Sequence, residues 1–404
     1  MDLKSGYPYW TVKNGLLANY PALREDLACD VVVVGAGITG ALIADRLVRA
    51  GFEVCVIDRR EAGWGSTSAS TGLLQYEIDV ELAELSAHTG EADAVLVYRQ
   101  CEQAIPALLR LARELGKVDV RPMQSLYYAS RWHHRSRLLK EAALRQSHGF
   151  DVRVLDRAQI LDRYGFEAPV ALLTRLAAQV DPYQMAHRLL ARVVRRGGRV
   201  FDRTTMASFD AGNRGVKVRI DNAGSIRCRQ LILAAGYEGQ RLLAQRVARN
   251  RSSYAFVSDP LPDGPGPLAD CLVWESARPY LYVRSTRDGR VIVGGDDDRI
   301  DLPIKRDALV ALKVEKLRKR AANLFPSLPL EPAFGWAGTF AETEDGLPFF
   351  GPHPQHGSRV HFAMAYGGNG IVYSQIGAEL LCARLEGRKH PCDKLFSFDR
   401  LNRS

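Results

Sequence analysis

Residues 30–60 read DVVVVGAGITGALIADRLVRAGFEVCVIDRR, and this stretch decides the fold. Its four consecutive valines form a short apolar run, which is typical of a strand buried on both faces. Gly35, Gly37 and Gly40 follow with the spacing G-x-G-x-x-G, and residues 54–57 form a second apolar run. The pattern predicts a strand, a glycine turn, a helix and a second strand, the unit that binds a dinucleotide.

Each glycine of this turn has its own use. Gly35 permits a tight turn, Gly37 lets the backbone approach a pyrophosphate, and Gly40 lets the helix pack close to the strand. The free N–H groups and the positive dipole end of the helix then face the phosphates. Asp58 ends the second strand, where a carboxylate accepts hydrogen bonds from the ribose hydroxyls of an adenosine. The motif alone leaves open whether the dinucleotide is NAD or FAD.

The composition is that of an ordinary globular protein. With 404 residues, of which 46% are hydrophobic and 25% charged, the chain is long enough for two domains with a large core. The net charge of +9 is spread along the chain, and its densest stretches, 131–145 and 305–320, carry apolar residues at helical spacing. We interpret them as solvated helix faces and expect no nucleic-acid partner. Since no apolar run reaches the length of a membrane span, none is expected.

Cysteine and histidine usage indicates no metal site. The seven cysteines are an odd number without a C-x-x-C pair, and the nine histidines lack metal-ligand spacing. Reduced, mostly buried thiols and a cytoplasmic location are expected. Residues 1–28 lack the apolar core of a secretory signal, and their aromatic stretch at 7–10 is expected to pack on the body of the protein as an arm.

The order of predicted elements indicates an α/β fold, α+β overall. One nucleotide-binding unit lies near the N-terminus, and α/β pattern returns near 181–240 and 360–390 after β-rich interruptions. This order predicts a discontinuous Rossmann-like domain with an inserted mixed β-sheet domain for the substrate. We expect the dinucleotide-binding domain to comprise residues 29–80, 150–245 and 335–404, the substrate domain residues 81–149 and 246–334, and the arm residues 1–28.

Four further stretches carry a resemblance to a known family. They are GSTSAST at 65–71, LILAAG at 231–236, TEDGLPFFG at 343–351 and YGGNG at 366–370. Together with GAGITG and the acidic residue after the second strand, they resemble the FAD-dependent oxidoreductases of the D-amino acid oxidase family. That family includes glycine oxidase, sarcosine oxidase and gamma-glutamylputrescine oxidase. The resemblance covers about residues 29–387 and implies FAD as the cofactor.

The resemblance also implies which residues bind FAD. The first glycine turn surrounds the pyrophosphate, the hydroxyl-rich loop at 65–71 donates hydrogen bonds, and the turn at 366–370 opens a helix whose positive end stabilises the reduced flavin. The implied set comprises Gly35, Ala36, Gly37, Ile38, Thr39, Gly40, Asp58, Arg59, Ser66, Thr67, Ser68, Thr71, Gly72, Met206, Ala235, Gly236, Gly338, Asp345, Gly367, Gly368, Asn369, Gly370 and Ile371.

Two positions predict that the FAD is not covalently attached. Gly338 stands where sarcosine oxidase bonds its flavin to a cysteine. Ala69 stands where members similar to dimethylglycine dehydrogenase use a histidine in the hydroxyl-rich loop. Neither side chain can form the bond, so dissociable FAD is expected.

The reaction that the resemblance implies is removal of hydride from the carbon next to an amine nitrogen, with transfer to flavin N5 and hydrolysis of the imine. The cations with which family members hold a substrate carboxylate are missing, since Phe340, Gln75 and Val372 occupy their positions. A buried carboxylate without a cation is costly, so an amine or a modified amino acid is favoured over a simple α-amino acid. Arg278 or Arg284 could supply a replacement cation.

Candidate catalytic residues follow from the same positions. Aromatic side chains on the predicted strands can form a cage for an amine through cation–π contacts. The candidate catalytic residues are Tyr366, Arg278, Phe340 and Gln75, and the further aromatic candidates are Tyr254, Trp274, Tyr280 and Tyr282. Apolar Val291 and Ile292 stand near the position of the lysine that helps sarcosine oxidase use oxygen, so oxygen and another electron acceptor both remain open.

Two other functions remain open at this point. The same fold could oxidise a C–OH bond of a small-molecule substrate. The chain could also be a flavin-containing subunit for RNA modification, or a partner subunit, in which the basic surface matters. The sequence leaves the oligomeric state open.

Overall fold

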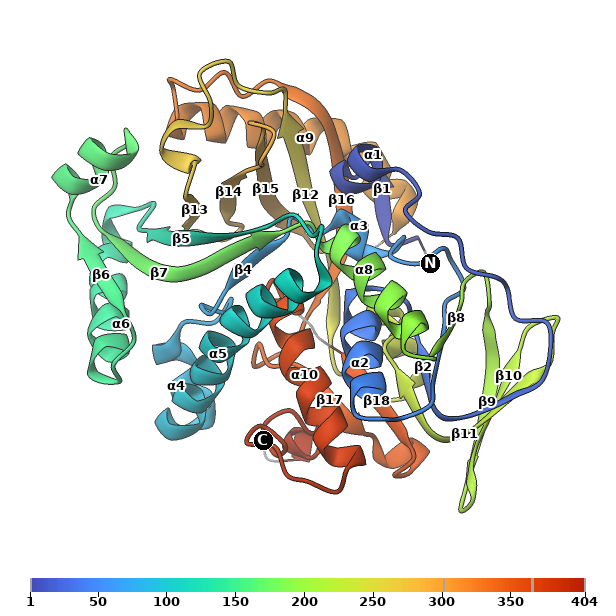
Figure 1. Ribbon diagram of the computed structural model, residues 1–404. Helices are drawn as coiled ribbons and strands as arrows, with labels where there is room; N and C mark the ends of the chain where they lie inside the picture. The colour runs from blue at the N-terminus through green and yellow to red at the C-terminus, as the bar shows by residue number, and fades with distance from the viewer. Residues whose placement is uncertain (1, 301, 365–366, 403–404) are drawn as a thin grey trace.

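The computed structural model describes residues 2–300, 302–364 and 367–402, which build two sheets with helices around them (Figure 1). The first sheet has eight strands, and its central strands are parallel, as expected for a dinucleotide-binding sheet. Its order is β17 (Phe349–Pro352), β18 (Val360–Met364), β11 (Ser225–Leu233), β2 (Leu27–Val34), β3 (Val54–Ile57) and β8 (Arg199–Phe201), with β10 (Gly215–Ile220) pairing with β11 and β9 (Met206–Gly212) pairing with β10.

The glycine motif forms the predicted turn between β2 and α2 (Ile38–Arg49). Gly35 has a φ of +117°, and a Cβ added there would lie 2.2 Å from the carbonyl oxygen of Ala234. A Cβ added to Gly40 would lie 1.8 Å from the carbonyl oxygen of Gly35. Only glycine therefore lets the helix approach its own turn this closely. The predicted strand–turn–helix–strand unit is confirmed.

Three helices pack together beside this sheet: α2, α8 (Pro182–Arg195) and α10 (Gly370–Leu385) (Figure 1). The N-terminus of α8 is capped by Asp181, whose carboxylate accepts a hydrogen bond of 2.8 Å from the backbone N–H of Gln184. Asp156 and Gln159 form a capping box at the start of α7 (Arg157–Tyr164). Local sequence signals thus place the helix starts correctly.

The second sheet has ten strands, most of them antiparallel. The helix α9 (Pro303–Leu324) packs against β16, β12 and β15, and the helices α4 (Leu82–Thr89), α5 (Glu91–Leu115) and α6 (Arg135–Ser147) lie towards the other end (Figure 1). The order is β1 (Lys4–Gly6), β16 (Pro332–Glu342), β12 (Arg249–Ser258), β15 (Val291–Asp298), β14 (Leu281–Ser285), β13 (Cys271–Glu275), β5 (Val120–Tyr128), β7 (Ala171–Val180) and β4 (Leu73–Gln75), with β6 (Val152–Leu155) pairing with β7.

Strand pairing differs from the expected domain division near its borders. The strands β4, β6, β7 and β16 all pair within the second sheet, although the division assigned residues 150–180 and 335–342 to the dinucleotide-binding domain. An apolar run shows that a strand is present, but its partner lies far away in sequence, so periodicity cannot assign it to a sheet. The helix α5 runs continuously through Pro106.

The N-terminal arm packs on the body, as expected. It contributes β1 to the second sheet and the short helix α1 (Tyr9–Asn14). Trp10 is fully buried, and its indole Nε1 donates a hydrogen bond of 2.6 Å to the carbonyl oxygen of Ser70 in the hydroxyl-rich loop. All seven cysteines are free and buried. Among the described helices, none combines the length and the apolar character that crossing a bilayer requires.

Candidate active site

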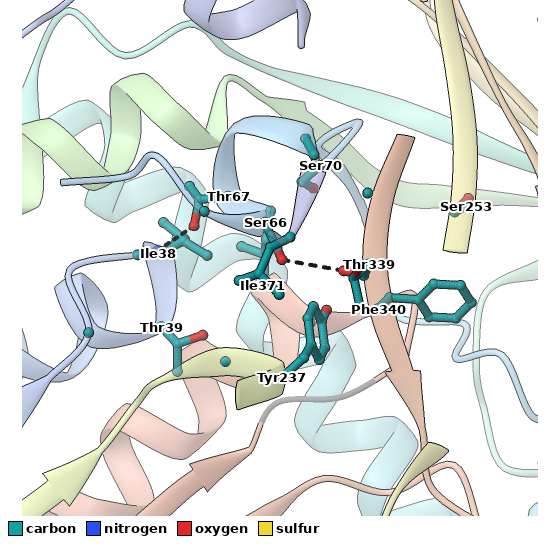
Figure 2. Close-up of a pocket in the computed structure, with 18 of the residues that line it drawn as sticks. Ile38, Thr39, Ser66, Thr67, Ser70, Tyr237, Ser253, Thr339, Phe340 and Ile371 are labelled. Atoms are coloured by element: carbon teal, nitrogen blue, oxygen red, sulfur yellow. Dashed lines mark hydrogen bonds between the residues drawn. The ribbon is translucent and has the colours of Figure 1, made fainter. Parts of the chain in front are cut away.

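A cavity of about 520 Å³ lies where the two sheets meet. Its walls come from the glycine turn before α2, the hydroxyl-rich loop with α3 (Ser66–Ala69), the C-terminal end of β11, the start of α10 and several strands of the second sheet. Figure 2 shows Ser66 and Thr67 between Ile38 at the start of α2 and Thr339 on β16. We call the part of the cavity nearest the glycine turn the cofactor end.

Asp58 closes the cofactor end from the tip of β3. Its Oδ2 accepts a hydrogen bond of 2.7 Å from the backbone N–H of Ala36, and its Oδ1 accepts one of 2.9 Å from the backbone N–H of Arg60. Burial raises the pKa of this carboxyl group. Nearby, Glu238 pairs with Arg59 at 2.5 Å and with Arg60 at 3.2 Å. The acidic residue expected to hold a ribose thus lines the cavity in a fixed orientation.

Two helices begin at the cavity, α2 and α10. The N-cap residues Gly37 and Asn369 make no side-chain capping hydrogen bond, and the first turns of both helices line the cavity, so their positive ends lie at its wall. The backbone N–H of Ile38 donates to Oγ1 of Thr67 at 2.9 Å, which ties the first turn of α2 to the hydroxyl-rich loop (Figure 2). A Cβ added to Gly37 would lie 2.9 Å from the same Oγ1 atom.

These features fit FAD. One helix N-terminus can take the pyrophosphate and the other the polar edge of the flavin, while Asp58 takes the ribose. Gly338 and Ala69 lie side by side at the wall, because a Cβ added to Gly338 would lie 3.0 Å from the Cβ of Ala69. The two positions at which the resemblance implies covalent attachment in related proteins therefore lie together here without a reactive side chain.

Arg284 holds the hydroxyl-rich loop instead of lying on the surface. Its side chain is buried, and its Nη1 donates to the carbonyl oxygens of Thr71 at 2.8 Å, Gly72 at 3.0 Å and Val180 at 3.2 Å. Burial lowers the pKa of this guanidinium to about 10. Arg284 does not line the cavity, so it is placed to position the loop and not to bind a substrate.

Most of the expected site residues come together around this cavity. Two of the candidate catalytic residues, Phe340 and Gln75, line it as well. The expected cofactor-binding residues that line it are Gly35, Gly37, Ile38, Thr39, Asp58, Arg59, Ser66, Thr67, Thr71, Gly72, Met206, Ala235, Gly236, Gly338, Gly367, Gly368, Asn369, Gly370 and Ile371.

Four expected cofactor-binding residues do not line the cavity. Ala36 and Gly40 shape the turn behind the wall, and the hydroxyl of Ser68 donates to the carbonyl oxygen of Gly65 at 2.9 Å within its own loop. Asp345 lies outside the cavity, where its Oδ2 accepts a hydrogen bond of 2.7 Å from Nε of Arg400.

The remaining candidates are Arg278 and Tyr366. The guanidinium of Arg278 donates to the backbone carbonyl of Asp79 and lies 4.6 Å from the ring centroid of Tyr280, next to the cavity but not on its wall. Tyr366 falls outside the described residues.

The opposite part of the cavity, which we call the substrate end, is walled by aromatic rings of the second sheet. Its lining includes Trp274, Tyr280, Tyr282 and Phe340. Gly294 makes room for one of them, because a Cβ there would lie 2.4 Å from the hydroxyl oxygen of Tyr282. The ring of Trp274 is fixed from behind by Tyr127, whose ring centroid lies 3.9 Å away.

Polar groups complete the substrate end. Nε2 of Gln75 and Nε1 of Trp274 both donate to the hydroxyl of Ser125, at 2.8 Å and 3.0 Å. The amide of Asn369 donates to the carbonyl oxygens of Gln75 and Glu77, at 3.0 Å and 2.9 Å. Asn369 therefore ties the second glycine turn to the strand that carries Gln75.

The charges that line the cavity are unevenly distributed. The lining arginines belong to the cofactor end: Arg59, Arg60 and Arg241. Glu77 and Asp79 line the substrate end, where no lysine or arginine lines the wall within the part of the chain that the structure describes. The sequence analysis missed both carboxylates, although they follow the hydroxyl-rich loop by only a few residues. It also missed Tyr237, which comes directly after LILAAG and lines the cavity (Figure 2).

Comparison with known proteins supports FAD as the cofactor. The family described as DAO, FAD dependent oxidoreductase, matches residues 30–384. The chain is 25% identical over 403 residues to gamma-glutamylputrescine oxidoreductase of Escherichia coli, covering 94% of this chain and 88% of that protein. It is 25% identical over 378 residues to glycine oxidase of Geobacillus kaustophilus, covering 91% of this chain and 96% of the relative.

Solved structures share the fold. The crystal structure of glycine oxidase from Geobacillus kaustophilus superposes with a TM-score of 0.77 at 20% identity, over 92% of this chain and 98% of that chain. L-proline dehydrogenase from P. horikoshii superposes with a TM-score of 0.74 at 16% identity, over 95% of this chain and 99% of that chain. With the family match over most of its length, this chain belongs to the DAO family of FAD-dependent oxidoreductases.

Proposed function

We propose that this protein oxidises the C–N bond of an amine that lacks a neighbouring carboxylate. The bound FAD would supply the acceptor for a hydride, that is, for one proton and two electrons from the carbon next to nitrogen. The nitrogen lone pair forms the C=N bond, and water then hydrolyses the imine to a carbonyl compound and a free amine. The chain's own part is to bind the amine, orient its C–H bond and exclude water.

One observation carries this proposal. The substrate end is lined by Glu77 and Asp79 together with four aromatic rings, and no described lysine or arginine lines it. Arg145 pairs with Glu77 and Arg278 lies beside Asp79, but neither guanidinium lines the cavity, so a substrate carboxylate would meet no cation on the wall, at a cost of about 3 kcal/mol. An amine avoids this cost, and its positive charge before deprotonation is attracted to both the carboxylates and the ring faces.

The second candidate is oxidation of a C–OH bond in the same cavity. A panel of primary and secondary amines, α-amino acids and α-hydroxy acids separates the two when each compound is mixed with the FAD-loaded protein without oxygen. The proposal expects amines to bleach the flavin band near ~450 nm, with oxygen and an artificial acceptor then restoring it in parallel reactions. Bleaching by hydroxy acids alone would overturn it in favour of C–OH oxidation.

We also propose that the FAD is dissociable. Gly338 and Ala69 line the cavity and offer no atom that could bond to the flavin ring. Precipitation of the protein with acid should release all the flavin into the supernatant. Yellow colour that stays with the precipitated chain would contradict this proposal.

A further inference from the structure

One buried hydroxyl, that of Ser125 on β5, fixes two side chains of the substrate end. Ser125 is fully buried, and its Oγ accepts hydrogen bonds from Nε2 of Gln75 at 2.8 Å and from Nε1 of Trp274 at 3.0 Å. The ring of Trp274 is also stacked on that of Tyr127, with an angle of 17° between the two planes. Since Gln75 and Trp274 line the cavity and Ser125 does not, the hydroxyl holds both side chains from behind the wall.

The hydrogen bonds of Ser125 determine how the amide group of Gln75 is turned. A hydroxyl group accepts two hydrogen bonds and donates one. The two N–H donors fill both acceptor positions, and the hydroxyl proton goes to Glu77, whose carboxylate it stabilises. Gln75 therefore directs its NH₂ group to Ser125 and leaves its Oε1 for the cavity. Among the described residues, none donates a hydrogen bond to this oxygen.

The carboxylate of Glu77 is neutralised from the side of the protein. Its Oε1 accepts a hydrogen bond of 2.9 Å from the hydroxyl of Thr174 and lies 3.7 Å from Nη1 of the buried Arg145. Burial raises the pKa of this carboxyl group, and the charge of Arg145 and the hydroxyls of Thr174 and Ser125 oppose that rise. Glu77 thus fixes the orientation of Ser125, and the amide oxygen of Gln75 is the neutral acceptor on the wall.

The backbone places Gln75 beside the helix α10. Nδ2 of Asn369, the N-cap residue of α10, donates hydrogen bonds to the carbonyl oxygens of Gln75 and Glu77, at 3.0 Å and 2.9 Å. The family resemblance assigns the start of this helix to the reduced flavin, whose charge its positive end stabilises. The acceptor of Gln75 is therefore carried by a segment that is bonded directly to the flavin side of the cavity.

Oxidation of an amine needs an acceptor of this kind. The nitrogen must be neutral when the hydride leaves, because its lone pair forms the C=N bond, and the nitrogen gains positive charge as that bond forms. A carboxylate in contact with the nitrogen would favour the unreactive ammonium ion. An amide oxygen accepts an N–H of the neutral amine without a full negative charge, and this hydrogen bond strengthens as the nitrogen becomes positive.

We propose that Oε1 of Gln75 accepts a hydrogen bond from the N–H of the reacting amine and so orients the nitrogen lone pair. This inference rests on the proposed amine oxidation and adds the residue that binds the nitrogen. The ammonium ion first releases its proton to water. The C–H bond then breaks with its electron pair going to FAD, and the lone pair forms the C=N bond. Primary and secondary amines are the substrates that fit, because a neutral tertiary amine has no N–H.

The test is the pH dependence of flavin reduction in Gln75→Glu, which keeps the shape of the side chain but introduces a carboxylate. Each FAD-loaded protein is mixed without oxygen with a saturating secondary amine at pH values from about 6 to about 10, and the rate constant of reduction is measured. The rate rises with pH as the bound ammonium ion loses its proton. We expect the midpoint of this rise to move up by about 1 pH unit in Gln75→Glu, because the carboxylate stabilises the ammonium ion about 10-fold.

Gln103→Glu is the matched control, because Gln103 is exposed on α5 and does not line the cavity. Its pH profile should equal that of the unaltered protein. A loss of rate in Gln75→Glu that is the same at every pH, with the midpoint unmoved, would overturn the contact with the amine nitrogen.

A second test uses the unaltered protein and so applies even if Gln75→Glu fails to fold. We expect an N,N-dimethylalkylamine to bind about 10-fold more weakly than the N-methylalkylamine of the same chain length, because its neutral form cannot donate to Gln75. In Gln75→Met, which has no amide oxygen, the difference should shrink to about 3-fold or less. Equal Kd values for the two amines in the unaltered protein would overturn the proposal while leaving amine oxidation intact. Flavin reduction by no amine at all would overturn the proposed function itself, so the two failures are distinguishable.

Discussion

The two ends of the cavity are built in different ways. The cofactor end comes from short stretches of chain in which the residues that act together are neighbours in sequence, such as the glycine turn and the acidic tip of β3. The substrate end is assembled from strands of the second sheet that lie far apart in sequence, with Gln75, Trp274 and Phe340 meeting across it. Backbone conformation determines the structure of the cofactor end, and side-chain chemistry determines that of the substrate end.

The largest expected effect tests the claim that backbone shape governs the cofactor end. In Gly40→Ala the new Cβ would lie 1.8 Å from the carbonyl oxygen of Gly35, which must move because it is backbone. We expect a loss of stability of about 3 kcal/mol and purification without flavin. Chemical denaturation measures the loss of stability, and the ratio of flavin to protein absorbance measures the loss of flavin. The control is Gly212→Ala, where an added Cβ meets open space and less than about 0.5 kcal/mol is expected.

The second effect concerns charge at Asp297, which lies beside the substrate end but does not line the cavity. Burial raises the pKa of Asp297 from 3.8 to about 7, with Asp79 and Glu342 adding to the rise and Arg278 opposing it. The folded state therefore prefers the protonated carboxyl group. The stability that this preference contributes is fully present below the unfolded pKa and is lost as the pH rises through about 7.

Asp297→Asn should then be more stable than the unaltered protein by about 2 kcal/mol near pH 8, because the amide is never charged. Near pH 4 the difference should largely disappear. Denaturation curves at both pH values measure it. An equal difference in stability at pH 4 and pH 8 would show that ionisation of Asp297 is not its cause.

The third and smallest effect concerns Arg284, which lies on β14 of the second sheet and binds the hydroxyl-rich loop. In Arg284→Met, the carbonyl oxygens of Thr71 and Gly72 lose a buried donor, and the hydroxyl-rich loop loosens. We expect FAD to bind about 10-fold more weakly, while the Kd for substrate in the FAD-saturated enzyme stays unchanged. The matched control is the exposed Arg214→Met. A weaker substrate Kd at unchanged FAD affinity would instead make Arg284 a substrate clamp.

The same contrast explains how far the sequence predicts this molecule. The turn, the helix starts and most cofactor residues follow from local patterns, since strand, glycine spacing and cap residues are all contiguous. Local patterns do not predict that β7 and β16 belong to the second sheet, because that depends on pairing between segments that are distant in sequence. The position of Asp345 outside the cavity could not be predicted either, because a loop residue gives no local indication that it will pair with Arg400.

The substrate end shows most clearly which features cannot be predicted from the sequence. The sequence predicted that cationic clamps are missing at Phe340 and Gln75, and both residues do line the cavity. It did not predict that Glu77 and Asp79 supply negative charge there, because a carboxylate after a short strand has no local mark of function. Only the folded chain brings these carboxylates next to the rings of Tyr280 and Tyr282.

The separation of the two ends can be measured directly by titrating FAD into purified Asp58→Asn and Asp79→Asn and then reducing each FAD-saturated protein with an amine. In Asp58→Asn the side chain can no longer accept from both the Ala36 and the Arg60 N–H groups, so we expect about a 100-fold weaker FAD Kd and a nearly unchanged reduction rate. In Asp79→Asn we expect nearly unchanged FAD affinity and weaker binding of the amine substrate. Equal loss of FAD affinity in both variants would contradict the account.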